Sequence, residues 1–404
     1  MRRVASDRKA FRADKRPLYS MVYVSMFLSN PFKPDPRVKR EAGSLSRAGF
    51  RVKVLAWDRE GRFEREEVVD GFEVVRFRFR SGYGSLTRLV PGFLLFYAYL
   101  LVHVTRSRPD VVHCHDMDTV LPGLIASLIL GCKVVYDMHE SYPDFVSTFS
   151  PSFFVSFLRI LESFIAPRCD LVIVTSTMIG ELARKNGARR IVAIMNCFDP
   201  FNVQEKEARD LRRRILGRRD DWFLVLYIGG LFPGRGLEKV VQAVSRVEKV
   251  VLFLGGYGPY ETDLKRLVNK LGIEERVVFA GEVDPREVPL YDAAADLMFA
   301  MYEAVDPNNV VTIPNKLFES IAAAKPILVS DVGEKARLVS EIGNGIAVDP
   351  RDVDGIAQAI ENLARDGELY ARMVSRAKQG QDRYSWASME SRLIQAYRQL
   401  IACW

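Results

Sequence analysis

A glutamate, a lysine and an asparagine stand together where a helix is expected to begin. Residues 311–331 read VTIPNKLFESIAAAKPILVSD, which predicts a helix over 316–324 with Asn315 as its N-cap. The open N–H groups of a first helical turn attract an anion, and Lys316 adds positive charge there. Glu319 shares a helix face with Asn315, and a carboxylate can accept hydrogen bonds from both hydroxyls of a ribose. We predict nucleotide binding; the alternative is a surface helix with an ordinary glutamate.

A glycine-rich turn, YIGGLFPGRG at residues 227–236, is expected between a strand and a helix. It nearly matches a Walker A loop, but Arg235 replaces the lysine and Gly236 replaces the residue that holds magnesium. A P-loop nucleotide hydrolase is therefore disfavoured. The loop can still approach a phosphate closely through Gly229 and Gly230, and Arg235 can grip it with two donors. The alternative is a tight turn with a solvated arginine.

A second glycine turn, LFLGGYGP at residues 252–259, follows another expected strand. Gly256 and Gly258 are followed by Pro259, so the G-x-G-x-x-G spacing of dinucleotide-binding loops is absent. A nicotinamide cofactor is disfavoured, and with it a redox enzyme.

The first half of the chain places histidines and aspartates at expected strand ends. His139, in DMHE at residues 137–140, can donate to a sugar hydroxyl from the carboxyl end of a strand; the alternative is a structural histidine. His113 and His115 share one face of a strand, but no third ligand is evident, so we predict no metal there. Asp116-Met117-Asp118 resembles a metal-binding DxD, a spacing that is common by chance, and we predict no metal site there either.

Composition limits the class of protein. The 404 residues, 48% hydrophobic and 27% charged, predict a globular protein of more than one domain. Residues 1–16 contain seven arginines and lysines and two acidic residues, Asp7 and Asp14. They therefore contribute +5 of the net charge of +7. We predict a disordered basic tail that can touch an anionic membrane surface, and a near-neutral body without a nucleic-acid partner.

Cysteine usage and the apolar runs bear on the compartment. Five scattered cysteines without CxxC spacing indicate thiols in a reducing compartment, so we expect a cytoplasmic protein. The longest uncharged run, residues 89–104, is interrupted by Pro91-Gly92 and is shorter than the ~20 residues of a spanning helix. It predicts a buried helix or one that lies in a membrane surface.

Short β-branched runs alternate with helical patterns, which predicts an α/β fold of two doubly wound parallel sheets. The alternation breaks at Pro200 and restarts after a basic helix, so we expect a first domain over 17–198, a linker over 199–220 and a second domain over 221–380. Ligands of such sheets bind at the carboxyl ends of the strands, so a shared cleft between the domains is expected. The strands are expected at 18–26, 51–56, 72–79, 110–113, 133–137, 171–175, 191–195, 223–228, 250–254, 276–280, 297–301 and 326–330. The helices are expected at 38–48, 86–106, 119–130, 153–165, 205–216, 237–246, 260–271, 288–294 and 316–324.

Taken in order, these stretches resemble the family 4 glycosyltransferases, which have the GT-B fold of two Rossmann-like domains. PNKLFESIAAAKPILVSD is similar to the donor-site segment of that family in its PNKLFE variant, and YIGGLFPGRGLEKVV is similar to its phosphate loop. LFLGGYGP and VVFAGEVDPREVPLYDAAADL follow at the expected intervals. DPRVKREAGSLSRAGFRVKVL, RPDVVHCHD and VVYDMHE resemble the acceptor domain. Residues 381–404, with YSW at 384–386, resemble the terminal helix that crosses back onto the first domain.

The resemblance implies transfer of a hexosyl group, with retention, from a UDP- or GDP-sugar to a glycan or lipid-linked acceptor. No bound metal or other cofactor is implied, and the products are surface polysaccharides or glycolipids. The enzyme would be cytoplasmic, with peripheral contact at the inner face of the cell membrane.

By position, the resemblance also implies roles for single residues. Glu319 would hold the ribose hydroxyls, Arg235 the diphosphate and the backbone at Glu282-Val283 the base, while His139 would lie beside the transferred sugar. The full donor set is Gly229, Gly230, Arg235, Gly256, Glu282, Val283, Asn315, Lys316, Leu317 and Glu319, and the catalytic set is His139, Arg235 and Lys316. On the acceptor side we expect Asn30, Asp35, Arg37 and Asp116.

Two departures from the family pattern keep alternatives open. Val311 stands where the family has the first glutamate of an E-x7-E pair, and Gly230 stands where many relatives have arginine. One alternative is an enzyme similar to the UDP-GlcNAc 2-epimerases, which need no acceptor. Another is a non-catalytic subunit that binds a sugar nucleotide.

Overall fold

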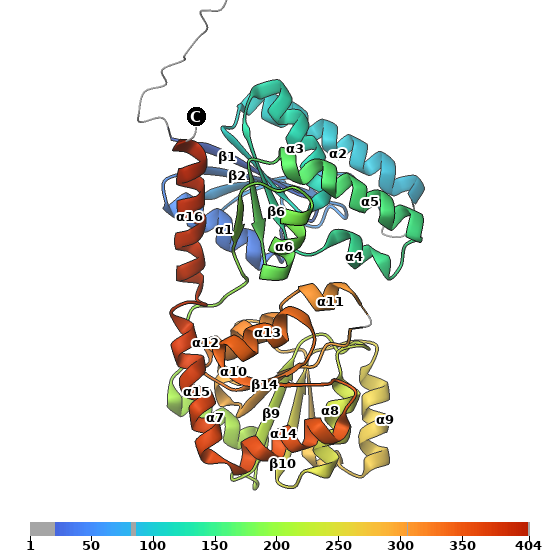
Figure 1. Cartoon of the computed structure of the whole chain (residues 1–404), viewed down its shortest axis with the longest axis vertical. Coiled ribbons are helices and arrows are strands. Elements are labelled where there is room, and N and C mark those ends of the chain that lie inside the picture. Colours follow the sequence, from blue (N-terminus) through green and yellow to red (C-terminus); the bar gives the residue numbers. More distant parts are fainter. Residues whose placement is uncertain (1–20, 82–85, 305, 403–404) are drawn as a thin grey trace, which may run out of the picture.

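A computed structural model of the chain describes residues 21–81, 86–304 and 306–402. Figure 1 shows two α/β domains stacked end to end, with the long helix at the C-terminus lying along the first of them. The predicted α/β class with two Rossmann-like domains is confirmed. The basic tail predicted for residues 1–16 lies outside the described residues.

The first domain is built on one sheet with the strand order β3-β4-β2-β1-β5-β6-β7-β8. All neighbouring strands are parallel except β3, which runs antiparallel to β4 at the edge. The strands are β1 (Tyr23–Leu28), β2 (Arg51–Asp58), β3 (Glu66–Val69), β4 (Phe72–Arg78), β5 (Val111–His115), β6 (Lys133–Met138), β7 (Leu171–Val174) and β8 (Ile191–Ala193). The helices are α1 (Pro36–Arg47), α2 (Leu86–Ser107), α3 (Met117–Leu130), α4 (Tyr142–Ser147), α5 (Ser152–Ile165), α6 (Thr177–Lys185) and the short η1 (Ala166–Arg168).

The central strands of this domain are buried on both faces, as their apolar runs require. On one face α1 and the C-terminal helix α16 (Trp386–Ala402) cover the sheet. On the other face α2, α3 and α5 contribute to a second apolar cluster, in which the ring of Trp57 stacks on Phe96 of α2 at 5.3 Å between centroids. The run at residues 89–104 is thus part of a core helix, although Leu94 and Leu95 remain exposed.

The second domain has a parallel sheet with the order β11-β10-β9-β12-β13-β14. Its strands are β9 (Phe223–Ile228), β10 (Val250–Gly255), β11 (Val277–Gly281), β12 (Leu297–Ala300), β13 (Ile327–Ser330) and β14 (Gly345–Val348). Its helices are α7 (Glu205–Leu216), α8 (Leu237–Arg246), α9 (Glu261–Leu271), η2 (Glu274–Arg276), α10 (Val288–Ala294), α11 (Asn308–Val311), α12 (Asn315–Ala322), α13 (Gly333–Ile342), α14 (Val353–Arg365) and α15 (Gly367–Gln381).

Each sheet has a point where the strand order reverses, and such points form crevices at the carboxyl ends of the strands. In the first sheet the reversal lies between β1 and β5, and in the second between β9 and β12. The loops that carry most of the predicted site residues follow these strands and their neighbours β6, β10 and β11.

Loops at the carboxyl ends of the two sheets touch each other. The side chain of Asn308 in α11 donates to Glu140, just after β6, at 2.9 Å, and the hydroxyl of Ser176, just after β7, donates to the carbonyl of Val311 at 2.6 Å. The backbone N–H of Thr177 donates to Glu334 at 2.9 Å. The two carboxyl-end edges therefore face each other, and we call the region between them the interdomain site.

The predicted crossover of the C-terminal helix is confirmed, whereas the predicted linker over 199–220 is too long. Helix α16 packs on α1, with an Arg47–Glu390 ion pair at 2.6 Å. Helix α7, expected within the linker, packs on α10, and Arg212 bonds to Asp296 at 2.5 Å. The chain thus crosses between the domains in the coil over 194–204, and α7 belongs to the second domain.

Candidate active site

The two glycine loops of the second domain pack backbone against backbone. Gly256 has φ +122°, and a Cβ atom there would overlap the carbonyl oxygen of Gly229, so only glycine fits. The N–H of Gly229 donates to the carbonyl of Gly255 at 2.9 Å, and that of Gly256 to Gly281 at 2.6 Å. Both amides are engaged, so Gly229 and Gly256 contribute close approach rather than open N–H donors for a phosphate.

Helix α12 begins one residue earlier than predicted. Pro314 is the N-cap, without a side-chain hydrogen bond, and Asn315 is the first helical residue with an exposed side chain. The prediction of Asn315 as the cap is therefore wrong, because the chain enters the helix with Pro314 in an extended conformation. Asn315 still lies at the helix end, where N–H groups remain open toward an anion.

Lys316 reaches from the start of α12 to the end of β9. Its Nζ donates to the carbonyl of Ile228, lies 4.7 Å from the centre of the Tyr227 ring, and is 3.8 Å from an Oε of Glu319. Both side chains of this ion pair are largely buried, yet Glu319 keeps some exposed surface. The fold thus brings together the lysine and the glutamate that the sequence placed on one helix.

Two tyrosines, Tyr302 and Tyr227, connect Arg235 to Lys316 and Glu319. Its guanidinium stacks 4.3 Å from the centre of the Tyr302 ring. Burial, with a hydrogen bond to Tyr302, raises the pKa of Tyr227 above its usual value, while Arg235 acts to lower it and Glu319 to raise it. The charges of Arg235 and Glu319 therefore both act on Tyr227, the residue over which Lys316 sits.

Three other residues of the predicted donor set, Glu282, Val283 and Leu317, differ in how exposed they are. Val283 lies against the end of β10, close to Gly255, and Glu282 beside it is exposed. Leu317 is fully buried in the core, and its N–H donates to the carbonyl of Pro314 at 3.0 Å. The expectation that Leu317 contacts the donor is corrected, because its position on the inner side of α12 turns it into the sheet.

On the first-domain side, His139 is held between two carboxylates. Its Nε2 lies 2.8 Å from Asp137 and its Nδ1 3.3 Å from Asp116. Burial acts to lower the pKa of the His139 imidazole, but Asp116 and Asp137 outweigh it and raise that pKa well above its usual value. The two carboxylates therefore favour the charged form of the His139 imidazole.

Asp116 holds this position with a strained backbone. Its φ of +61° and ψ of 163° lie in a region that residues other than glycine rarely adopt, and such strain gathers at functional sites. Its N–H donates to the carbonyl of Asp137 at 3.0 Å, which ties the two carboxylate residues together. Asp116 is the predicted acceptor-side residue that the structure places beside His139.

Two further acids surround His139 and Asp116. Burial and the charge of Asp116 raise the pKa of Asp118 to about 7 and that of Glu140 to about 7. Glu140 was in the DMHE segment and Asp118 in the DxD segment, but nothing in the sequence showed that they converge. Glu140 keeps some exposed surface, so its carboxyl group can accept hydrogen bonds from sugar hydroxyls, whereas Oδ1 of Asp118 is buried.

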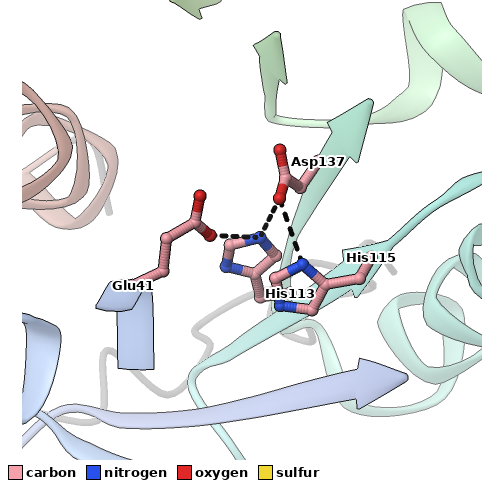
Figure 2. Close-up of side chains that lie close together, drawn as sticks. All are labelled: Glu41, His113, His115 and Asp137. Atoms are coloured by element: carbon pink, nitrogen blue, oxygen red, sulfur yellow. Dashed lines mark hydrogen bonds and ion pairs between the residues drawn. The ribbon is translucent and has the colours of Figure 1, made fainter. Parts of the chain in front are cut away.

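Figure 2 shows a buried cluster of titratable groups, two of which, Asp137 and His115, contact His139. Glu41 from α1, His113 and His115 from β5, and Asp137 from β6 offer ligand atoms within 4.8 Å of one another. The sequence did not show that two carboxylates join the two histidines, because Glu41 and Asp137 come from elements far apart in the chain. The sheet register pairs His115 with Asp137. By residue type the four could hold a divalent cation.

Arg37 already occupies both carboxylates of this cluster. Its guanidinium donates to Asp137 at 2.6 Å and lies 2.9 Å from Glu41, so a metal ion would share its ligands with a fixed positive charge. Burial raises the pKa of Asp137, but Arg37 and His139 outweigh it and hold that pKa well below its usual range. The hydroxyl of Tyr397 in α16 lies 2.7 Å from Nδ1 of His113, which links the returning helix to the cluster.

Three predicted acceptor-side residues, Asn30, Asp35 and Arg37, make contacts that brace the first domain. Arg37 is 5% exposed, so the expectation that it meets the acceptor is corrected: its partners Asp137 and Glu41 draw it inward. Asp35 caps α1 by accepting from the N–H of Val38 at 3.0 Å. The side chain of Asn30 donates to Asp35 at 2.8 Å, which fixes the loop before α1.

Val311, at the position of the missing family glutamate, is a domain-contact residue. Its carbonyl accepts from Ser176, and its side chain packs against the apolar cluster of the first domain. A carboxylate at this position would be buried against apolar side chains, which is costly unless it is paired.

Two family models match successive parts of the chain. The model described as Glycosyltransferase Family 4 matches residues 37–200, and the model described as Glycosyl transferases group 1 matches residues 208–380. The chain is a family 4 glycosyltransferase domain joined to a group 1 glycosyl transferase domain. The boundary between the two models falls in and just after the coil where the chain crosses between the domains.

Relatives of this glycosyltransferase act in several contexts. An uncharacterized glycosyltransferase of Methanocaldococcus jannaschii is 25% identical over 72% of this chain and 76% of its own length. The GDP-mannose-dependent alpha-(1-6)-phosphatidylinositol monomannoside mannosyltransferase of Mycobacterium tuberculosis is 28% identical over 50% of this chain and 53% of its own. The lipopolysaccharide core biosynthesis glycosyltransferase LpsE of Rhizobium meliloti is 30% identical over 44% and 49%.

Solved structures show the same fold. Anabaena Alr3699/HepE in complex with UDP superposes with a TM-score of 0.74 at 20% identity, covering 93% of this chain and 99% of that one. Sucrose-phosphate synthase from Thermosynechococcus elongatus superposes with a TM-score of 0.76 at 19% identity, covering 95% and 100%.

Proposed function

We propose that this protein transfers a hexosyl group, with retention, from a UDP- or GDP-sugar to a hydroxyl of a glycan or lipid-linked acceptor. The observation that carries the proposal is the grouping of Arg235, Lys316 and Glu319 around Tyr227 at the carboxyl end of β9. Two cations and a carboxylate at that point match the diphosphate and the ribose of a nucleotide. A structural neighbour was solved with UDP and with UDP-glucose, which supports this donor class.

The two cations have a chemical task in this reaction. When the bond to the sugar breaks, negative charge grows on the departing diphosphate, and fixed positive groups stabilise it without reorganising. Arg235 can present two N–H donors, while Lys316 is a compact charge held near the start of α12. We propose that these groups make a bound metal unnecessary. Turnover that falls on EDTA treatment and returns with Mg²⁺ or Mn²⁺ would contradict this part.

The first domain supplies the partner of the sugar. In the proposal, the His139 imidazolium donates its two N–H groups to Asp116 and Asp137, holds these carboxylates in place and supplies positive charge beside the transferred sugar. Asp118 and Glu140, with pKa values of about 7, can accept hydrogen bonds from hydroxyls of the donor sugar and the acceptor. In the proposal, these groups make the sugar contacts that a glutamate at position 311 would make in other members of the family.

The names of two relatives favour a lipid-linked acceptor. One is named for phosphatidylinositol monomannoside and the other for the lipopolysaccharide core. We extend this to the present chain as a cytoplasmic enzyme with peripheral contact at the inner face of the cell membrane, acting in surface glycolipid or polysaccharide synthesis.

Donor binding followed by turnover tests the proposal. Thermal-shift screening with UDP-, GDP- and ADP-sugars identifies the donor, and NMR of the product with a lipid or glycan acceptor gives the anomeric configuration. A 2-epimerised or hydrolysed donor formed equally fast without acceptor would favour the epimerase alternative. Donor binding without turnover over a broad acceptor panel would favour a non-catalytic subunit. If none of the nucleotide sugars stabilised the protein, the proposed donor site would be wrong.

A further inference from the structure

Helix α5 carries apolar side chains on two opposite sides. Val155, Leu158 and Ile165 are buried against the first domain. On the opposite side, spacings of four, three and four residues place a second apolar stripe within roughly 60° of the helix circumference. With the exposed phenylalanines of α4 and the turn after it, this stripe consists of Phe145, Phe149, Phe153, Phe157, Ile160 and Phe164, each between 40% and 75% exposed. We call these six residues the phenylalanine face.

The phenylalanine face is too large for an ordinary protein surface. At about 200 Å² for a whole aromatic side chain, its exposed apolar area is on the order of 700 Å². The largest apolar patch on a typical soluble monomer covers about 300–600 Å². An exposed area of this size marks a surface that is covered when the protein works.

The face begins next to the interdomain site. Helix α4 starts two residues after Glu140, and Phe145 packs edge-on against Phe149 at 5.6 Å between ring centres. Figure 1 shows α4 at the end of the first domain nearest the second, with α5 running from there beside α3. Exposed Leu94 and Leu95 of α2 add apolar surface on the same domain.

The exposed charges in the segment that carries the face are positive. Within residues 141–169, which the structure describes in full, the exposed charged side chains are Arg159 and Arg168. Asp144 is half-buried and paired with Arg159 at 2.9 Å, while Glu162 is buried. The guanidinium of Arg168 lies 3.6 Å from the centre of the Phe164 ring. Phenylalanines flanked by arginines are the pattern of a helix that lies in the interface of an anionic membrane.

We propose that the phenylalanine face docks on an anionic lipid surface, with its rings at the boundary between headgroups and acyl chains. A second copy of the chain fits less well, because protein interfaces contain about one hydrogen bond per 100–200 Å². The exposed polar side chains of α5 besides Arg159 are serines. Among the described residues no helix has the length and apolar character to cross a bilayer, so the contact lies in one leaflet. Its purpose rests on the proposed function, since it would bring a lipid-linked acceptor to the interdomain site.

Vesicle sedimentation tests the proposal on the full chain. We expect the protein to sediment with phosphatidylcholine vesicles that contain phosphatidylglycerol, and less with phosphatidylcholine alone. Replacing Phe153 and Phe157 together by serine should reduce the bound fraction roughly tenfold or more. The matched control replaces Met21 and Val68, equally exposed apolar residues away from α5, by serine and should bind as the wild type does.

The outcomes separate this proposal from the others. Equal binding by the two double variants, or no binding by the wild type, overturns it. If the wild type does not bind vesicles but sediments as a dimer that the Phe153 and Phe157 change makes monomeric, the face belongs to a second copy. Calorimetry with UDP and GDP on the same variant should give the wild-type dissociation constant, so failure of membrane docking and failure of donor binding are distinguishable. The melting temperature of the variant checks that it folds.

Discussion

The two sides of the interdomain site are electrostatic opposites. The second-domain side brings Arg235 and Lys316 together with the carboxylate of Glu319 around two tyrosines. The first-domain side brings the acids Asp116 and Glu140 close to His139, and Asp118 lies close to Asp116. A cationic surface suits phosphates and an acidic one suits neutral polyols, so a nucleotide sugar spanning the gap has one fixed orientation. In the proposed function, this division of charge between the two domains would make the donor and acceptor sites distinct.

The largest expected effect is on the cationic side. Arg235→Ala should lower kcat roughly 100- to 1000-fold, because it removes a donor from charge that develops in the transition state. The dissociation constant for UDP or GDP should rise much less, since the ground state is less dependent on that donor. Steady-state kinetics and calorimetry on the same preparation measure the two quantities. Arg246→Ala, an exposed arginine of α8 paired with Asp354, is the control. Proportional losses in kcat and binding would make Arg235 a binding residue only.

On the acidic side, His139→Ala should lower kcat roughly 100-fold. The half-buried His103 of α2, outside the interdomain site, serves as the control in a His103→Ala variant. Similar losses from the two variants would reduce His139 to a structural residue.

The pH dependence sharpens the role of Asp116. Its carboxylate holds the pKa of His139 up, so the charged form is present below the usual histidine pKa and is lost only as pH rises through the raised value. Asp116→Asn should lower that value, and the alkaline limb of kcat/KM should move down by roughly 1 pH unit. The shape of the profile carries the test, because Asp116 itself can contact the acceptor. An unmoved limb in Asp116→Asn would show that the titrating group is not His139.

A smaller effect is expected for nucleotide binding. Glu319→Ala should weaken UDP or GDP binding roughly tenfold, about 1.4 kcal/mol, the scale of charge-assisted hydrogen bonds to the ribose hydroxyls. Glu368→Ala, an exposed glutamate in the first turn of α15, is the control for calorimetry. A dissociation constant equal to that of the control would remove Glu319 from the donor site.

Several helices and strands could be read from the sequence, because local pattern decides them. The strand Phe223–Ile228 and the helices Leu237–Arg246 and Val288–Ala294 were predicted to the residue. No elements were predicted for residues 333–381, which form α13, β14, α14 and α15, and the short α4 and α11 were also missed. Helix α11 has four residues and is held by its contacts with the first domain, which no local pattern reports.

The site shows the same limit. Lys316 and Glu319 are three residues apart on one helix, so their ion pair follows from local spacing. Arg37 and Glu41 are likewise on one helix, but their common partner Asp137 is on β6, and the β5–β6 register that sets His115 opposite Asp137 is a tertiary fact. The sequence therefore showed Arg37 as a surface residue of a loop region, and only packing shows it buried. The valine at position 311 is likewise explained only by the tertiary structure, in which this residue contacts the first domain.

The last expected effect concerns stability and separates it from function within the acids. Glu140 and Glu162 both have their pKa raised from 4.5 to about 7, Glu162 by burial between Tyr136 and Asn186. An acid with a raised folded pKa stabilises the fold below its unfolded pKa, and that contribution is lost as pH rises from about 4.5 through about 7. For Glu162 the loss is at most about 3 kcal/mol, or several degrees in Tm.

Glu162→Gln and Glu140→Gln remove this titration, so the Tm of each variant relative to wild type should rise between pH 5 and pH 8. Scanning calorimetry at the two pH values measures it. Only Glu140→Gln should change kcat, because Glu162 lies in the core of the first domain behind β6. A loss of activity in Glu162→Gln at unchanged stability would mean that the acids of this domain act as one electrostatic unit, and the contrast between an acidic acceptor side and an inert core would fail.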